Sequence, residues 1–143
     1  MLTSRDMLRL GIILILVWQA SAAQAAENVT GRWMTEDKSA VISIAPCGIQ
    51  MCGTIAQLLV NTPGMPRTDV NNPDPALRSR PLEGLRIISG LSRNGVRWEG
   101  GRIYDPLTGK SYKSYLQLTE GGVLKVAGCL AFICRAQRWT RAR

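Results

Sequence analysis

The sequence contains no histidine at any of its 143 positions. This absence excludes Ser-His-Asp and Cys-His catalytic sites, histidine metal ligation and proton transfer by imidazole. The chain is also poor in acidic residues, with 10 Asp and Glu against 18 Lys and Arg, which gives a formal net charge of +8. Its apolar content is ordinary for a globular protein, so extensive disorder is not expected.

The first 26 residues have the order of a secretory signal peptide. Arg5 and Arg9 form a positive start, residues 10–18 are an almost unbroken apolar run, and small residues follow up to Ala25 and Ala26. This order predicts cleavage near Ala25/Ala26 and a periplasmic or secreted protein. The apolar run is short for a membrane-spanning helix, so an uncleaved anchor is the less favoured alternative and no membrane-spanning segment is expected after cleavage.

Residues 27–143 have the length of a single domain, and their pattern is all-β. Short alternating or β-branched segments are separated by turn signals. Asn94-Gly95 is the strongest two-residue hairpin signal, and Asp105 to Gly109 form a typical turn. The eight expected strands are Thr30–Glu36, a segment containing Val41–Ile44, Met51–Leu59, Leu85–Leu91, Val96–Tyr104, Lys110–Leu118, Val123–Leu130 and Cys134–Arg141.

The segment from Val60 to Gly84 breaks this pattern. It holds five of the seven prolines and shows no alternation, which predicts a long Pro-rich loop after the third strand, with one helical turn near Pro75–Arg78. The short turns elsewhere favour an antiparallel meander that closes into a barrel, because closure removes exposed strand edges. A two-sheet sandwich is the alternative. The interior of an eight-stranded barrel holds side chains or one small ligand.

The four cysteines form two C-x4-C pairs, Cys47 with Cys52 and Cys129 with Cys134. An even number of cysteines in an exported chain indicates disulfides. In an up-and-down barrel the two pairs lie at opposite ends, about 20 Å apart, and a disulfide needs Cα atoms within about 7 Å. We therefore expect local disulfides. A zinc site is the alternative, although zinc ligands are usually closer in sequence, and a redox motif would use a two-residue gap.

Motifs along nearly the whole of this domain resemble those of a secreted proteobacterial family known as domain of unknown function 2147. They are Gly31-Arg32-Trp33, Cys52-Gly53-Thr54-Ile55, Asp69 with Asn72-Pro73, Arg80-Pro81-Leu82 with Gly84-Leu85, the run from Trp98 to Pro106, Gly109-Lys110 with Tyr112, and Trp139-Thr140-Arg141. The resemblance implies a calycin-like or lipocalin-like barrel, and the family has no established activity.

The first of these motifs is also similar to the Gly-x-Trp that begins the first strand of lipocalins. In lipocalins an arginine from a late strand packs over this tryptophan, and here Arg141 or Arg138 could supply it. The long prolyl loop and the short chain depart from the lipocalin pattern. Taken together, the residues and the resemblances predict an antiparallel, eight-stranded, calycin/lipocalin-like barrel.

The expected strand order gathers three unusual segments at one end of the barrel: the 60–84 loop, the 105–110 turn and the 130–133 tip. We take this end as the candidate mouth of a binding site. The candidate ligand-binding residues are Trp33, Trp98, Asp69, Asn72, Asp105, Lys110 and Phe132. Packing in the core is the competing expectation for the tryptophans.

Metal binding and catalysis are weighed against simpler explanations. The oxygen-rich run over residues 69–74 has ligands that calcium prefers, but such side chains usually cap turns. Glu99 and Asp105 lie six residues apart, roughly 20 Å along a regular strand, and Asp105 is better placed to stabilise its own turn than to act as one of a glycosidase pair. We therefore expect no catalytic residue, no metal and no cofactor.

The 130–133 tip is apolar, where hairpin tips are usually polar. We expect it to fold inward and plug the barrel, or to be part of a strand; contact with a ligand, a membrane or a partner is the alternative. Arg135, Arg138, Arg141 and Arg143 concentrate positive charge near the C-terminus. We interpret Arg135 to Arg141 as a solvated strand face. In an exported protein their partners would be anionic envelope components rather than nucleic acid.

These observations predict an exported, non-catalytic module that binds a small apolar or anionic ligand. The alternative is a cell-envelope interaction protein that acts through its basic and apolar surface. The sequence specifies neither the ligand nor the oligomeric state.

Overall fold

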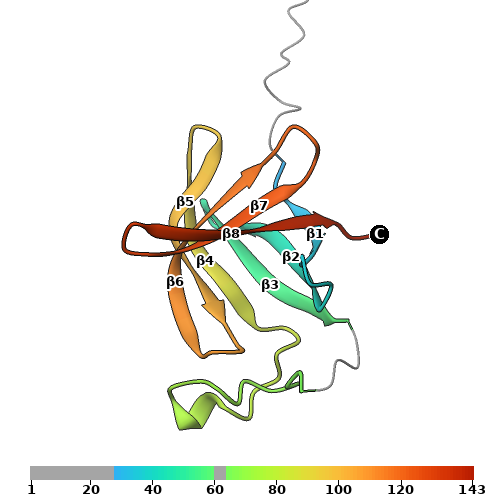
Figure 1. Cartoon of the computed structure of the whole chain (residues 1–143), viewed down its shortest axis with the longest axis vertical. Coiled ribbons are helices and arrows are strands. Elements are labelled where there is room, and N and C mark those ends of the chain that lie inside the picture. The colour runs from blue at the N-terminus through green and yellow to red at the C-terminus, as the bar shows by residue number, and fades with distance from the viewer. Residues whose placement is uncertain (1–27, 60–63) are drawn as a thin grey trace, which may run out of the picture.

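The computed structural model describes residues 28–59 and 64–143, so the predicted signal peptide lies outside the described residues. Eight antiparallel strands follow one another in sequence order and form a closed barrel (Figure 1). This confirms the all-β prediction and the barrel rather than the sandwich. The strands are β1 (Gly31–Met34), β2 (Ala40–Cys47), β3 (Gln50–Leu58), β4 (Arg86–Asn94), β5 (Arg97–Asp105), β6 (Lys110–Leu118), β7 (Leu124–Leu130) and β8 (Ile133–Arg141). Within the described ranges, no helix is long and apolar enough to cross a membrane.

The turns follow the chemistry of their residues. Gly95 takes the positive φ that the two-residue turn between β4 and β5 requires. β1 ends earlier than expected because Thr35 begins a turn of its own. The Thr35 hydroxyl oxygen accepts hydrogen bonds from the backbone N–H groups of Ser39 and Ala40, both at 3.1 Å. The chain therefore leaves the sheet after Met34.

Solid packing occupies the half of the barrel nearest the β2–β3 and β4–β5 turns. Its side chains come from six of the eight strands, and the largest of them are fully shielded from solvent. They include Trp33, Ile44, Met51, Ile88, Leu91, Leu116 and Leu124. This packing forms a closed floor at one end of the barrel. The Pro-rich loop lies at the other end.

The barrel closes through a short seam. β1 and β8 pair at only two positions, Trp33 with Arg141 and Met34 with Thr140. The earlier part of β8 runs beyond the end of β1, and there the Glu36 carboxylate accepts a hydrogen bond from the backbone N–H of Arg138 at 2.9 Å. The guanidinium of Arg141 covers the Trp33 ring. The lipocalin-like Trp–Arg pair is therefore present, and Arg141 rather than Arg138 supplies the cation.

Both local disulfides form as predicted. Cys47–Cys52 clamps the hairpin between β2 and β3, and Cys129–Cys134 clamps the hairpin between β7 and β8. The β7–β8 tip does not plug the barrel. β7 continues to Leu130 and β8 begins at Ile133, so the strand interpretation holds for these two residues, whereas Ala131 and Phe132 form the turn; the side chains of the tip are exposed to solvent. Only the end of β8 pairs with β1, and the earlier part of β8 has no partner on that side. The hairpin therefore projects from the barrel wall (Figure 1).

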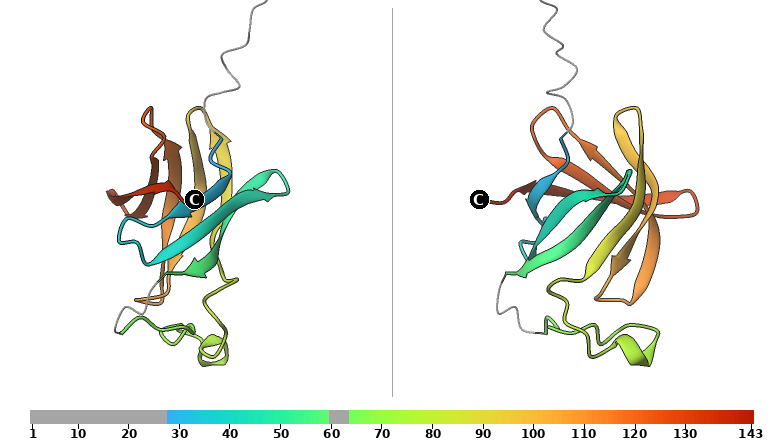
Figure 2. Two further views of the ribbon diagram at one scale, coloured as in Figure 1. Left: turned by 90° about the vertical axis from the view of Figure 1, so that its right-hand side faces the viewer. Right: turned by 180° about the vertical axis from the view of Figure 1, so that it is seen from behind.

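The described part of the Pro-rich segment, residues 64–84, lies under one end of the barrel, with a 3-10 helix η2 (Pro75–Leu77) where a helical turn was expected (Figure 2). Asp74 caps this turn, since its carboxylate accepts a hydrogen bond from the Ala76 N–H at 3.0 Å. Asn71 ties the loop to the β5–β6 turn by donating to the carbonyl oxygens of Pro106 and Leu107. The loop is thus fixed to the barrel end that carries the other unusual segments.

Candidate functional site

A cavity of about 670 Å³ lies inside the barrel at the end that carries the Pro-rich loop. Its walls are mainly apolar and come from strands β2 to β8. The wall side chains are Ala40, Ile42, Ile55, Leu58, Ile87, Ile103, Tyr112, Val126 and Trp139. A concave, largely apolar site with a few polar groups is the usual form of a small-molecule site.

Four connections form the rim of this cavity. They are the β1–β2 turn, the Pro-rich loop, the β5–β6 turn and the β7–β8 tip. Their lining residues are Thr35, Asp37 and Ser39, then Met65 and Leu82, then Asp105, Pro106 and Leu107, and finally Leu130 and Ile133. All four connections lie at one end of an up-and-down barrel, so the structure brings together the segments that the strand order predicted.

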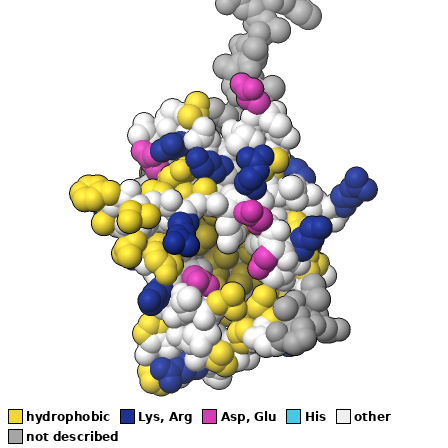
Figure 3. Space-filling view, viewed as in Figure 1, with side chains coloured by type: hydrophobic (Ala, Val, Ile, Leu, Met, Phe, Trp, Pro, Cys, Tyr) yellow, Lys and Arg dark blue, Asp and Glu magenta, His cyan; other side chains and the backbone are white. Residues whose placement is uncertain are grey.

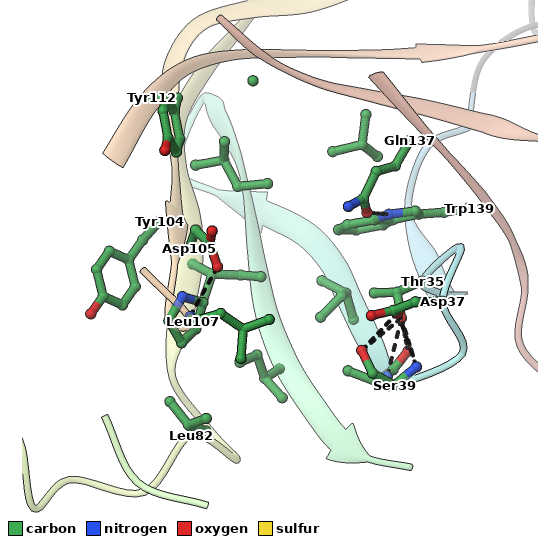
Figure 4. A pocket seen from close by; sticks show the side chains of 18 of the residues that line it. Thr35, Asp37, Ser39, Leu82, Tyr104, Asp105, Leu107, Tyr112, Gln137 and Trp139 are labelled. Carbon is green, nitrogen blue, oxygen red and sulfur yellow. Dashed lines mark hydrogen bonds between the residues drawn. The ribbon is translucent and has the colours of Figure 1, made fainter. Parts of the chain in front are cut away.

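One wall of the cavity is formed by alternate residues of β8. Arg135, Gln137 and Trp139 all line it, because residues two apart on a strand point to the same face. The Trp139 indole N–H donates to the Gln137 side-chain oxygen at 2.8 Å, so both side chains have fixed orientations (Figure 4). A flat aromatic surface next to a polar amide is a suitable contact for a ligand that is mostly apolar.

The charged residues of the cavity differ in how they are held. Among the residues that line the cavity, Arg135 is the one with a positive charge. Its guanidinium has no hydrogen bond or ion pair within the described residues. The carboxylate of Asp105 accepts from the Leu107 N–H and the Thr108 hydroxyl, both at 2.9 Å. Asp105 therefore stabilises its own turn, as expected, and Arg135 is the charge available to a ligand.

Asp37 is also held by its own turn. One carboxylate oxygen accepts hydrogen bonds from the Thr35 and Ser39 hydroxyl groups, both at 2.7 Å, and from the Ser39 N–H (Figure 4). Burial alone would raise the pKa of Asp37, but these hydrogen bonds outweigh it and hold the pKa below its ordinary value. The charged carboxylate is therefore a stable part of the rim.

A buried polar network fixes the Pro-rich loop to the wall of the barrel. Asp69 is fully buried, and its carboxylate accepts hydrogen bonds from the Tyr104 hydroxyl at 2.5 Å, the Asn72 amide at 2.8 Å and Arg80 at 2.9 Å. Arg80 also forms an ion pair with it at 2.8 Å. Figure 4 shows the Tyr104 ring turned away from the centre of the cavity. The network therefore supports the rim from outside.

The network changes the acidity of both of its central groups. Burial would raise the pKa of Asp69, but hydrogen bonds from Tyr104, Asn72 and Arg80, together with the Arg80 charge, hold it below its ordinary value. Burial, and then the hydrogen bond to the negative Asp69, raise the pKa of Tyr104 to about 12. At neutral pH the pair is thus a charged carboxylate and a neutral phenol.

The structure places the seven predicted ligand-binding residues in different surroundings. Asp105 lines the cavity. Trp33 lies in the core, where its indole N–H donates to the Val29 carbonyl at 2.8 Å, and Trp98 packs against the same core. Neither tryptophan lines the cavity. Asp69, Asn72 and Lys110 do not line it either: Asp69 and Asn72 belong to the buried network, and Lys110 is exposed on β6. Phe132 points into solvent at the tip, next to two rim residues.

Sequence reasoning missed Arg135, Gln137 and Trp139 as a set. Their period-two spacing was visible, but β8 was interpreted as a solvated strand face. Exposure of that strand is confirmed, since Arg135, Gln137 and Arg138 are all exposed, but Arg135 and Gln137 also line the cavity. The signal that could have found the set is the combination of one aromatic, one amide and one cation on a single face of the last strand.

Metal binding finds no support in the arrangement of the acidic side chains. Within residues 28–59 and 64–143, no group of three or more His, Cys, Asp or Glu side chains is close enough to hold a metal ion. The oxygen-rich run over residues 69–74 is used by the buried network, by the η2 cap and by contacts to the β5–β6 turn.

Comparison with known proteins gives one family and one related fold. Residues 31–141 match a family described as "Uncharacterized protein conserved in bacteria (DUF2147)". No curated protein matches the chain closely enough to be counted as a relative. Among solved structures, the chain is similar to protein HP1028 from the human pathogen Helicobacter pylori, which is described as belonging to the lipocalin family. The similarity has a TM-score of 0.70 and 20% sequence identity over 82% of this chain and 84% of that chain. It demonstrates a shared lipocalin-like fold.

Proposed function

This chain belongs to the DUF2147 family of bacterial proteins, and we propose that it is a non-catalytic module that binds a small, mainly apolar ligand inside its barrel. The observation that carries the proposal is the cavity of about 670 Å³ with apolar walls and a rim built by four connections. Its volume is within the range of small-molecule sites. The lipocalin-like fold supports the same conclusion, because eight-stranded barrels can hold one small ligand.

The ligand that fits best has an apolar body and an anionic end. The apolar body would lie against Trp139 and the aliphatic walls. The anionic end would meet Arg135, whose guanidinium can donate two parallel hydrogen bonds to a carboxylate or phosphate. The carboxylates of Asp37 and Asp105 already accept hydrogen bonds within their own turns.

The polar groups of the cavity support a role without catalysis. Ser39 donates its hydroxyl proton to Asp37, whose pKa lies below its ordinary value, so this carboxylate is a weak base and does not activate the serine. All four cysteines form disulfides, so none offers a thiolate. The sequence has no histidine to act as a base.

We also propose that the protein works outside the cytoplasm, in the periplasm or as a secreted protein, after cleavage near Ala25/Ala26. The two disulfides support this location because such bonds persist in oxidising compartments. Mass spectrometry of the intact exported protein tests it. The expected mass is that of a chain that begins at residue 26 or 27. The mass of the uncleaved chain would contradict the proposed export.

Ligand binding can be tested with the fluorescent anion 1-anilinonaphthalene-8-sulfonate, displaced by laurate. Val126→Trp narrows the cavity and is expected to weaken binding of both molecules at least tenfold. Val96→Trp is the matched control, because Val96 is exposed in the β4–β5 turn at the opposite end. Equal binding by the two variants, with both folded by circular dichroism, would contradict the proposal.

The contribution of Arg135 is tested by comparing laurate with dodecanol, which lacks the charge. Arg135→Gln is expected to weaken laurate binding about tenfold, consistent with the loss of one charged hydrogen-bonding partner, and to leave dodecanol binding unchanged. If both ligands lose affinity equally, Arg135 contributes packing rather than recognition of an anion.

A second candidate function, at the cell envelope, is supported by the exposed β7–β8 tip.

A further inference from the structure

The tip of the β7–β8 hairpin is a rigid apolar projection. Phe132 is fully exposed, and Leu130 and Ile133 are each 72% exposed. The Cys129–Cys134 disulfide closes the hairpin directly behind these three residues. In the space-filling view, apolar side chains protrude at this point from the outline of the molecule (Figure 3). Three adjacent exposed apolar side chains mark a surface that contacts something other than water.

The segment that contains the tip is strongly basic. Residues 110–143 contain seven Lys and Arg and one Glu, a net charge of +6, whereas residues 28–109 contain nine Lys and Arg and seven Asp and Glu, a net charge of +2. Lys113 is next to the tip, since it pairs with Cys129, and Arg135 directly follows the disulfide-bonded Cys134 in β8. The acidic residue of the segment, Glu120, is in the β6–β7 turn, which connects the other ends of the strands.

We infer that the β7–β8 tip docks the protein on an anionic lipid bilayer. Phe132 and its two apolar neighbours would enter the interfacial region, and Lys113 would meet the lipid phosphates. An apolar tip beside cations is the combination that binds such surfaces, since burial of apolar area and attraction to anionic lipids act together.

A bilayer fits this tip better than a protein partner does. Three side chains on a narrow hairpin offer far less area than a stable protein–protein interface, which buries roughly 800 Å² on each partner. Two copies meeting through their tips would also bring two basic segments together. A fluid lipid surface needs no complementary shape and supplies the opposite charge.

Docking in this way also positions the cavity. Leu130 and Ile133 belong both to the tip and to the cavity rim, so the tip places the rim next to the lipid surface. An apolar ligand could then pass between the bilayer and the barrel without crossing bulk water. Docking itself does not depend on ligand binding, and the two can be measured separately.

Sedimentation with lipid vesicles tests the docking. The purified protein is expected to bind vesicles of phosphatidylglycerol and phosphatidylethanolamine, to bind phosphatidylcholine vesicles at least tenfold more weakly, and to lose affinity as NaCl is raised. Phe132→Ser is expected to lower binding to the anionic vesicles about tenfold, the effect of losing one buried aromatic side chain. Laurate binding should not change in this variant.

Two matched controls make the test specific. Ile49 is 96% exposed at the tip of the other disulfide-clamped hairpin, so Ile49→Ser removes an equally exposed apolar side chain and should leave vesicle binding unchanged. Lys113→Glu should weaken binding several-fold, whereas Arg86→Glu, which makes the same change of charge on β4, should have a smaller effect. Arg135 stays intact in both variants, so the cavity is unaltered.

The inference is overturned if Phe132→Ser binds vesicles as the unchanged protein does, or if Ile49→Ser reduces binding equally. It is also overturned if the protein ignores vesicle charge, or if Phe132→Ser abolishes a dimer rather than vesicle binding. A protein that docks on vesicles but does not bind laurate would contradict the proposed function and leave the docking supported.

Discussion

The guanidinium of Arg141 lies 4.0 Å from the centre of the Trp33 ring and donates hydrogen bonds of 2.7 Å to the carbonyl oxygens of Thr30 and Asn28. This pair joins the first strand to the last at a seam of two residue pairs. The approach also explains the glycine of the Gly-x-Trp motif, because Gly31 has a φ of 131° and a Cβ there would collide with the Arg141 guanidinium.

Removal of this arginine should open the seam. Arg141→Ala is expected to lower the free energy of unfolding by about 2 kcal/mol, since two charged hydrogen bonds and a cation–π contact at a partly exposed site are lost. Urea denaturation measures the change. Arg143→Ala is the control, because Arg143 lies beyond the end of β8 and its side chain has no hydrogen bond or ion pair within the described residues. Equal stability of the two variants would show that Arg141 does not close the barrel.

The buried network should be the main attachment of the Pro-rich loop. Asp69→Asn is expected to cost about 3 kcal/mol, because it leaves three hydrogen-bond donors facing a group without charge. Limited proteolysis should cut first within residues 64–84. Asp74→Asn is the matched control, since asparagine also caps helical turns and should change little. Similar proteolysis of the two variants would argue against this role of Asp69.

The same network predicts a dependence of stability on alkaline pH. The folded-state pKa of Tyr104 is raised to about 12, so its proton stabilises the fold fully below the unfolded-state value near 10. This contribution, at most about 3 kcal/mol, is lost as the pH rises from about 10 to 12. Urea denaturation across this range should show a steeper loss for the unchanged protein than for Tyr104→Phe. Parallel curves would refute the assignment.

At acid pH, the stability of the fold depends on Asp69 and falls as the pH is lowered. Since the pKa of Asp69 is lowered below 3.8, its contribution is present above that value and is lost as the pH falls through the folded-state pKa. Asp69→Asn should therefore show a smaller loss of stability below pH 3.8 than the unchanged protein does.

Two polar atoms inside the barrel have no partner within the described residues, the Ser114 hydroxyl and the Trp98 indole N–H. Because a buried hydroxyl without a hydrogen bond is unfavourable, Ser114→Ala is expected to raise the free energy of unfolding by up to about 1 kcal/mol. Ser111→Ala, at an exposed position of β6, should have no effect. A loss of stability at Ser114 would mean that its hydroxyl holds a bound water or part of a ligand.

Local signals in the sequence predicted most of the fold. The Asn94-Gly95 turn, the alternation of Lys110–Leu118 and the cluster of prolines in residues 60–84 each depend on backbone chemistry within a few residues. The pairing of the cysteines and the common end of the loops then followed from counting strands, which is sufficient in an up-and-down barrel.

The cavity residues were harder to predict because they depend on how far each strand continues. β8 pairs with β1 at only two positions, and the local sequence does not specify how long this pairing is. Because the pairing is short, the β7–β8 hairpin turns outward and Phe132 lies in solvent. Trp33 and Trp139 look alike in the sequence, yet one lies in the closed floor and the other lines the cavity.

A crystal structure of the protein grown with laurate would show whether the barrel encloses a ligand. We expect an acyl chain inside the barrel, in contact with Trp139 and Val126, with the carboxylate at Arg135. A cavity filled by side chains or by ordered water, with laurate absent or bound only on the outer surface, would contradict it.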